Sequence, residues 1–588
     1  MASFMGPYTS VKTDLDVPSE MRDGTRLYAD VYRPDTHEKL PVLLTRMPYN
    51  KALSSRRTIA LDAIRAASHG YAVVVQDPRG RYSSEGEFYP FINEIPDGFD
   101  SVEWCGSQSW SNGNVGMFGR SYAGATQWLA AVSRPPSLKA IVPGVTSSNY
   151  YEGWTYQGGA LSYGFVASWA MFALTLGNLA TINRTTTIPE GTRQRLVKNI
   201  DEMLEESLWF LPLKEFPYLK DGLAPYFYDW LNHPTEDDYW KKVRIEDHYG
   251  NIDVAALNVG GWNDIFVNGT LKNYIGMTQQ GHSDLIRRGQ KLIMGPWHHS
   301  APAPEYSGEV YYGLMGSDSA IDLHGIPLKW YDYWLKGIDN GILGEAPVKL
   351  FVMGDNIWRD ENEWPLDRAQ YLDYYFHSRG KANSQQGDGT LSREYPKGET
   401  PDVYLYDPRN PVPTTGGGLC CYPGLLRPGP FDQSVTESRH DVLVYTTPTL
   451  EYDLEVTGPI TVTLYASSSA FDTDFTAKLV DVCPCSCTRN LTDGIIRARY
   501  RESRATAKLI EPGKVYEYRI DLMATSNVFK AGHKIRVDIS SSNFPRFDRN
   551  PNTGREPSEE ADLRPAVQTI FHDQEYSSYI TLPIIPKG

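Results

Sequence analysis

The residues most suggestive of chemistry surround a serine between a predicted strand and a predicted helix. The apolar run at 115–118 (VGMF) is typical of a buried strand, and 126–131 (TQWLAA) has the character of a helix. Between them, residues 119–124 (GRSYAG) place Ser121 among small neighbours, as in a nucleophile elbow, where a tight turn lifts the hydroxyl above the sheet. Ala123 stands where the usual G-x-S-x-G pattern has its second glycine, and alanine is small enough for this turn. The alternative is a plain strand-helix turn capped by serine.

A nucleophilic serine needs a base, and the base needs an acid to orient it. In the α/β-hydrolase fold these follow the serine in the order acid, then histidine. Asp264 comes directly after an apolar run at 254–259, whereas Asp253 lies at the opposite end of that run. Since ligands bind at the carboxyl ends of parallel strands, Asp264 is the favoured acid. His298 and His299 both follow the next predicted strand, and the pattern alone leaves both as candidates for the base.

An oxyanion hole should accompany this set. The backbone N–H of Tyr122, the residue after the nucleophile, supplies one donor in this fold. A second donor should come from the loop at 47–50 (MPYN), which follows another predicted strand. The hydroxyl of Tyr49 can serve there, and so can a backbone group of the same loop.

The predicted elements around these residues change character along the chain. Short apolar runs alternate with helical patterns over 1–149 and again over 250–355, as in a mostly parallel α/β sheet. Residues 150–249 are helical in pattern and rich in aromatics, which indicates an inserted helical cap. From 356 to 588, alternating runs such as 460–465 and 534–539 are separated by turn residues and predict an all-β jelly roll.

Composition restricts the partners. The formal net charge of −15 disfavours nucleic acid and anionic membranes, and we find neither a secretory signal nor an uninterrupted apolar run long enough for a membrane span. Six cysteines in 588 residues are no disulfide scaffold, so we expect a cytoplasmic protein. The run 483–487 (CPCSC) is spaced too tightly for a typical zinc site and has no nearby histidine, so a loop between strands is the favoured interpretation and no metal is expected.

Segments along nearly the whole chain resemble the family of bacterial cocaine esterases, which is similar to X-prolyl dipeptidyl aminopeptidases and α-amino acid ester hydrolases. They include 21–34 (MRDGTRLYADVYRP), 76–88 (QDPRGRYSSEGEF), 113–124 (GNVGMFGRSYAG), 261–266 (GWNDIF), 295–300 (GPWHHS), 350–366 (LFVMGDNIWRDENEWPL), 467–482 (SSSAFDTDFTAKLVDV) and 540–554 (SSSNFPRFDRNPNTG). The resemblance implies an α/β-hydrolase core, a helical cap and a C-terminal jelly roll.

The resemblance also implies roles for individual residues. It places the nucleophile on Ser121, the acid on Asp264 and the base on His299, which immediately precedes a serine as in the family pattern. The oxyanion tyrosine falls on Tyr49. The acyl pocket falls on three aromatic residues, Trp154, Trp169 and Phe266, for which packing between cap and sheet is the alternative. A loop that approaches the pocket in the esterase reads GLCCY (418–422) here, so the substrate is expected to differ from cocaine.

The expected activity is that of a serine carboxylesterase acting on small, aromatic-acyl esters through an acyl-enzyme, with no cofactor and with a homodimer as one possible assembly. Amide chemistry, by an aminopeptidase or a β-lactam acylase, is the alternative. It would need carboxylates to recognise a substrate ammonium, and Glu152 is the lone candidate. A non-catalytic carbohydrate-binding protein is the remaining alternative, which the intact Ser-Asp-His set disfavours.

Overall fold

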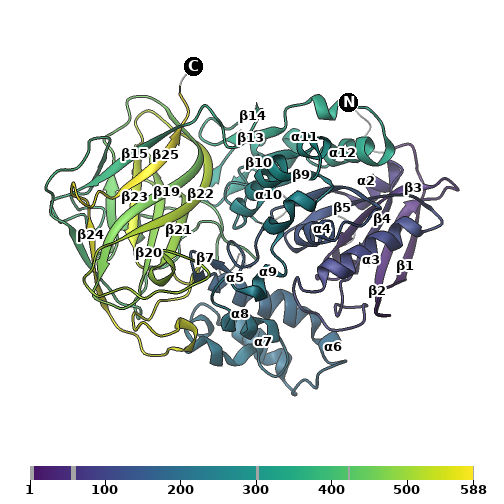
Figure 1. Cartoon of the computed structure of the whole chain (residues 1–588), viewed down its shortest axis with the longest axis horizontal. Helices are drawn as coiled ribbons and strands as arrows, with labels where there is room; N and C mark the ends of the chain where they lie inside the picture. The colour runs from purple at the N-terminus through teal and green to yellow at the C-terminus, as the bar shows by residue number, and fades with distance from the viewer. Residues whose placement is uncertain (1–5, 55–60, 300–303, 422–423, 425, 587–588) are drawn as a thin grey trace.

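The computed structural model describes residues 6–586 except 55–60, 300–303, 422–423 and 425. Two large β units flank a helical region (Figure 1). The first sheet runs in the order β1-β2-β4-β3-β5-β6-β9-β10-β13-β14, and β4 through β13 are parallel neighbours. The strand bounds are β1 (Val11–Glu20), β2 (Arg26–Pro34), β3 (Leu40–Arg46), β4 (Ala72–Gln76), β5 (Ser111–Arg120), β6 (Leu138–Gly144), β9 (Ala255–Gly261), β10 (Lys291–Gly295), β13 (Val348–Val352) and β14 (Ile357–Glu361).

The sheet is buried on both faces, which explains its continuous apolar runs. On β3, Val42 and Leu44 pack toward helices α3 (Glu94–Ser107) and α4 (Tyr122–Val132). Leu43 points to the other face, toward α2 (Ala63–Ser68) and α12 (Gly325–Lys336). The predicted α/β-hydrolase sheet is therefore confirmed.

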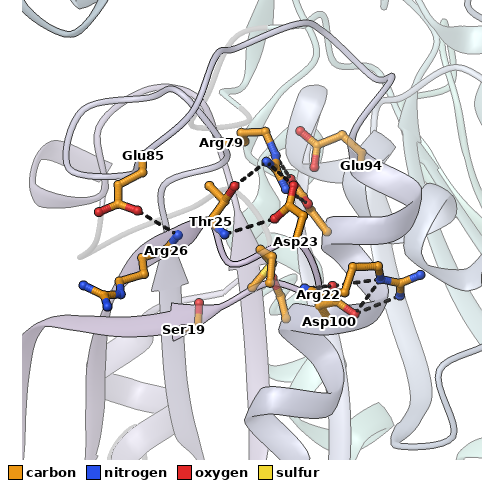
Figure 2. Close-up of polar contacts among 12 residues, drawn as sticks. Ser19, Arg22, Asp23, Thr25, Arg26, Arg79, Glu85, Glu94 and Asp100 are labelled. Atoms are coloured by element: carbon orange, nitrogen blue, oxygen red, sulfur yellow. Dashed lines mark hydrogen bonds and ion pairs between the residues drawn. The ribbon is translucent and has the colours of Figure 1, made fainter. Parts of the chain in front are cut away.

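Charged side chains tie the turn between β1 and β2 to helix α3 (Figure 2). Arg79 donates to Asp97 of α3 at 2.7 Å and to Asp23 of the turn at 2.8 Å. Arg22 pairs with Asp100 of α3, also at 2.8 Å. The hydrogen bond from Arg79 holds the pKa of Asp23 well below its usual range. These contacts fix α3, which packs against the helix that carries the elbow.

The segment between β6 and β9 forms a helical cap that lies between the two β units, at the bottom of Figure 1. It contains a short hairpin, β7 (Tyr156–Gln157) and β8 (Ala160–Leu161), and the helices α5 (Tyr163–Ser168), η1 (Trp169–Thr175), η2 (Leu176–Asn178), α6 (Leu179–Ile182), α7 (Thr192–Asp201), α8 (Pro225–Asn232) and α9 (Asp238–Lys241). The run Tyr163–Ile182 is long and apolar enough to cross a membrane, but 61% of its most apolar window is buried inside the molecule. That burial is typical of a core helix.

The second β unit is the predicted C-terminal β domain. Its described strands pair in one path, β17-β24-β19-β25-β15-β16-β18-β23-β20-β21, with β22 beside β19, and the pairings are antiparallel except β16 with β18. The bounds are β15 (Gln370–His377), β16 (Thr390–Ser392), β17 (Asp402–Tyr406), β18 (Leu443–Thr446), β19 (Leu454–Ser468), β20 (Asp474–Val482), β21 (Thr488–Arg497), β22 (Tyr516–Phe529), β23 (Lys534–Ser540), β24 (Ala566–Phe571) and β25 (Tyr579–Ile584). The runs predicted at 460–465 and 534–539 lie within β19 and β23.

Two details refine the sequence predictions. Strand β14 pairs with β13, so the first sheet continues to Glu361 and crosses the boundary expected at 355/356. The cysteine-rich run 483–487 is the turn between the antiparallel strands β20 and β21, as predicted. The other expected domain boundaries stay predictions.

Candidate active site

The turn from β5 into α4 has the strained geometry of a nucleophile elbow. Ser121 has φ 57° and ψ −124°, a conformation that L-residues rarely adopt. Gly119 precedes it with φ 133°, and a Cβ added there would lie 2.6 Å from the Cβ of Ala123. Glycine is therefore required at 119, and because it lacks a side chain, alanine fits at 123. This explains the departure from the usual motif.

A chain of hydrogen bonds joins the serine to the predicted base and acid. Nε2 of His299 lies 2.9 Å from Oγ of Ser121, and Nδ1 of His299 lies 2.7 Å from Oδ2 of Asp264. The other carboxylate oxygen of Asp264 accepts the backbone N–H of Phe266 at 2.7 Å. Asp264 is acceptor-only as a carboxylate, so Nδ1 carries the hydrogen and Nε2 is free to take the serine proton.

The competing candidates, His298 and Asp253, lie outside this series of hydrogen bonds. The ring hydrogen bonds to Ser121 and Asp264 come from His299, while burial lowers the pKa of the neighbouring His298. Asp253 is exposed and precedes β9, at the amino end of the strand. Of the predicted alternatives, the structure brings only His299 and Asp264 to the serine.

Tyr49, one of the two predicted oxyanion donors, lies beside the nucleophile. The hydroxyl oxygen of Tyr49 accepts the indole N–H of Trp169 at 3.1 Å, and Ser121 is among the side chains that influence its pKa. Burial raises the pKa of Tyr49, against the opposing effects of Trp169 and nearby cations, so the hydroxyl keeps its proton at neutral pH. Tyr122 is the first residue of α4, where backbone N–H groups lack partners within the helix. Its side chain points elsewhere, donating to Glu94 at 2.8 Å.

The three predicted pocket aromatics form one cluster beside the base. The rings of Trp154 and Phe266 are stacked, with centroids 4.3 Å apart, and Trp169 meets Trp154 edge-on at 5.4 Å. Phe266 also lies edge-on to His299 at 5.1 Å. Phe165 stacks on Trp169 at 5.7 Å. The sequence prediction missed Phe165, because nothing in the pattern distinguishes it from other cap aromatics.

A second residue that the sequence prediction missed is Arg120, immediately before the nucleophile. Its Nη1 donates to the backbone carbonyl of His299 at 3.0 Å. Burial lowers the pKa of Arg120 to about 10, and electrostatic interactions with Tyr49 and Asp264 oppose the shift. The guanidinium is therefore still charged at neutral pH. The sequence signal that could have identified Arg120 was its position in the elbow motif, directly before the nucleophile.

A loop of the second β unit also reaches the site. A Cβ added at Gly418 would lie 3.1 Å from the carbonyl oxygen of Asp264, so this loop packs directly on the segment that bears the acid. Cys420 and Cys421 follow and are joined as a disulfide, as are Cys483 and Cys485 in the β20–β21 turn. Each bridge closes a loop of at most a few residues, so neither cross-links the fold.

Two groups of described residues have ligand atoms close enough to hold a metal ion. One consists of His299, Cys420 and Cys421, and the other of Cys483, Cys485 and Cys487; within each group the atoms lie within 4.8 Å of one another. The serine chemistry uses His299 as its base but requires no metal ion at either group.

Comparisons with known proteins identify the family of the chain. Residues 23–301 match the model of the X-Pro dipeptidyl-peptidase (S15) family, and residues 340–581 match that of the X-Pro dipeptidyl-peptidase C-terminal non-catalytic domain. The chain is 40% identical to the cocaine esterase of Rhodococcus sp. (strain MB1 Bresler), over 98% of this chain and 99% of the relative.

Two solved structures share the fold. An aminopeptidase from a marine sediment Thaumarchaeota archaeon superimposes with a TM-score of 0.77 at 25% identity, covering 100% of this chain and 98% of the other. An α-amino acid ester hydrolase superimposes with a TM-score of 0.78 at 24% identity, covering 98% and 96%. The chain belongs to the S15 family of serine hydrolases and is a homologue of cocaine esterase.

Proposed function

We propose that the protein is a serine carboxylesterase that hydrolyses small, aromatic-acyl esters through an acyl-enzyme. The observation that supports this most is the hydrogen-bonded chain from Ser121 through His299 to Asp264, with the Tyr49 hydroxyl at the nucleophile. The serine is 9% exposed and the other two members of the chain are buried, so bulk water is largely kept from their hydrogen bonds.

Catalysis proceeds in two steps. His299 takes the proton of Ser121 as its oxygen attacks the ester carbonyl, and Asp264 stabilises the imidazolium that forms. The oxyanion receives hydrogen bonds from the Tyr49 hydroxyl and the Tyr122 backbone N–H. His299 then protonates the leaving alcohol. Water, deprotonated by the same histidine, attacks the acyl-enzyme and releases the acid.

The aromatic cluster supports an aromatic acyl group. Stacked and edge-on rings line the side of His299 with flat apolar surface, which suits a planar ring better than a branched aliphatic chain. The name of the 40%-identical relative, cocaine esterase, points the same way.

An aminopeptidase activity is less well supported. Recognition of a substrate ammonium requires a carboxylate that is free to pair with it. The candidate, Glu152, already interacts with Arg504 at 3.3 Å and accepts the backbone N–H of Gly158 at 3.0 Å. The negative charge of Glu152 is therefore already paired with a cation of the protein itself.

A substrate panel tests the proposal. We expect kcat/KM to be highest for p-nitrophenyl benzoate, lower for p-nitrophenyl butyrate, and lowest for aminoacyl p-nitroanilides. Ser121→Ala should lower kcat by about a millionfold and abolish labelling by a fluorophosphonate. Preference for the aminoacyl amides would favour the peptidase alternative, and unchanged labelling of the Ser121→Ala variant would refute the nucleophile. No turnover of any ester by the folded wild type would favour the binding-protein alternative.

We also propose that the protein is cytoplasmic and that it forms a homodimer. Fractionation of the native host cells tests the first, and light scattering of the purified protein tests the second.

A further inference from the structure

The pair Cys420–Cys421 occupies an unusual place for two cysteines. Cys420 is 2% exposed and belongs to the same hydrophobic cluster as Trp154 and Phe266, and Cys421 packs against that cluster. The loop that carries both residues is held close to the site because Gly418 lies against the backbone of Asp264. The two sulfurs therefore line the site that contains the catalytic base.

His299 and the two cysteines offer the ligand atoms of a metal site once the bond between the two sulfurs is reduced. A ring nitrogen of His299 and both sulfurs lie within 4.8 Å of one another. Zinc binds thiolate sulfur at about 2.3 Å and imidazole nitrogen at about 2.0–2.1 Å, so three ligands of one tetrahedral ion lie roughly 3.5–4 Å apart. Two cysteines and one histidine, with an open fourth position, are a donor set that zinc prefers.

We propose that the reduced form of Cys420 and Cys421, together with His299, binds Zn²⁺ or a similar soft divalent cation and thereby inhibits the enzyme. In the structure the two sulfurs are bonded to each other, so the site must first be opened. A phosphine or dithiol reductant supplies two electrons, and two protons from solvent complete the two thiols. Zn²⁺ then displaces both thiol protons into solvent and accepts the lone pair of the histidine.

The bound ion inhibits the enzyme because it binds the nitrogen of His299 that acts as the base. Nδ1 of His299 is engaged by Asp264 at 2.7 Å, so the nitrogen available to the ion is Nε2. That atom lies 2.9 Å from Oγ of Ser121 and is the one that must accept the serine proton. An ion bound there occupies the base, and the nucleophile stays protonated. The disulfide form has no thiolates to hold the ion and is insensitive.

The second cysteine group provides a matched control. Cys483, Cys485 and Cys487 also have their sulfurs within 4.8 Å of one another, but they lie in the β20–β21 turn and include no histidine. This group could bind zinc without reaching the triad. Replacing all three by serine removes that background, and the resulting protein should retain the inhibition of the wild type.

The experiment uses the full chain with the turn cysteines replaced, reduced with a phosphine. Titration with Co²⁺, a spectroscopic substitute for Zn²⁺, should give one ion per chain with a sulfur-to-cobalt charge-transfer band, and Zn²⁺ should displace it. Adding Cys420→Ser and Cys421→Ser should abolish the band. Relative to each protein's own metal-free rate, this change should raise the half-inhibiting Zn²⁺ concentration for p-nitrophenyl butyrate more than about 100-fold.

Several results would overturn the proposal: no charge-transfer band in the reduced protein, equal zinc inhibition without the two cysteines, or equal inhibition of the oxidised protein. Because the cobalt spectrum needs no turnover, failure of the esterase proposal is distinguishable from failure of this one. If the serine variant does not fold, zinc protection of Cys420 and Cys421 against iodoacetamide in the reduced wild type decides instead, and absence of protection refutes the site.

Discussion

The hydroxyl of Tyr49 gives the sharpest test of how the site stabilises charge. Tyr49→Phe removes one of two proposed oxyanion donors and leaves the Ser121–His299–Asp264 chain and the Tyr122 N–H in place. In the structure this hydroxyl accepts the indole N–H of Trp169 at 3.1 Å, so its own hydrogen remains available to donate to an oxyanion. Loss of one such donor costs about 2.7–4 kcal/mol of transition-state stabilisation, or about 10²–10³ in kcat.

The same substitution has a separate effect on stability. The indole N–H of Trp169, on a side chain that is 1% exposed, loses its acceptor. A buried unsatisfied donor costs about 1–3 kcal/mol. Typical folding free energies are about 5–15 kcal/mol, so the variant stays folded and its lost activity is not due to unfolding. Urea denaturation of the variant and the wild type measures this loss of stability.

The assay is steady-state kinetics with p-nitrophenyl butyrate. A donor that acts only in the transition state lowers kcat and kcat/KM equally, and KM stays unchanged. Trp169→Phe is the matched control, since it removes the indole donor but keeps the tyrosine hydroxyl, and it should lower kcat less than about tenfold. Tyr49 is not an oxyanion donor if Tyr49→Phe retains kcat within about threefold of wild type, or if KM alone rises.

Three further predictions concern the triad and the second β unit. Asp264→Asn should lower kcat about 10⁴-fold with little change in KM, because the amide favours the wrong histidine tautomer; a loss below about tenfold would contradict this. Arg120→Met should lower kcat about tenfold, because its guanidinium holds the His299 carbonyl at 3.0 Å, and Arg120→Lys should recover part of the loss; equal activity of Arg120→Met and wild type would argue against positioning. In the second β unit, burial disfavours the charged form of His572, but hydrogen bonds and charges of Asp402 and Glu399 outweigh it and raise its pKa. Because the folded-state pKa is raised, this stabilisation is full below about pH 6.5 and is lost as pH rises through the folded pKa. The difference in Tm between wild type and His572→Gln should therefore narrow from about pH 6 to about pH 9. A difference that widens would contradict a raised pKa of His572 in the folded protein.

The order of elements was readable from the sequence because it rests on local patterns. Buried parallel strands are continuously apolar, so β3, β4 and β9 stood out as short runs, and the helical cap and the alternating strands differ from them in period. The elbow was readable too, since a strand, a tight turn and a helix must follow one another directly. Asp264 could be chosen over Asp253 because direction along a strand decides which end faces the ligand crevice.

Other features needed the folded molecule. The choice between His298 and His299 depends on side-chain direction at the end of β10, which adjacent positions in a sequence do not specify, and only the resemblance to a family favoured His299 beforehand. The pairing of β14 with β13 carries the first sheet past residue 355, a contact that a change in composition does not reveal.

The sequence by itself determined that this chain has a hydrolase sheet with a nucleophile elbow at Ser121, because those features are set by neighbouring residues. Only the tertiary structure decided what surrounds the serine: Arg120 on the His299 carbonyl, the aromatic cluster, and the Cys420–Cys421 pair brought in from the second β unit. The physical reason is separation along the chain. Cys420 lies far from Ser121 in sequence, and their proximity arises from packing between the two β units, which no local pattern encodes.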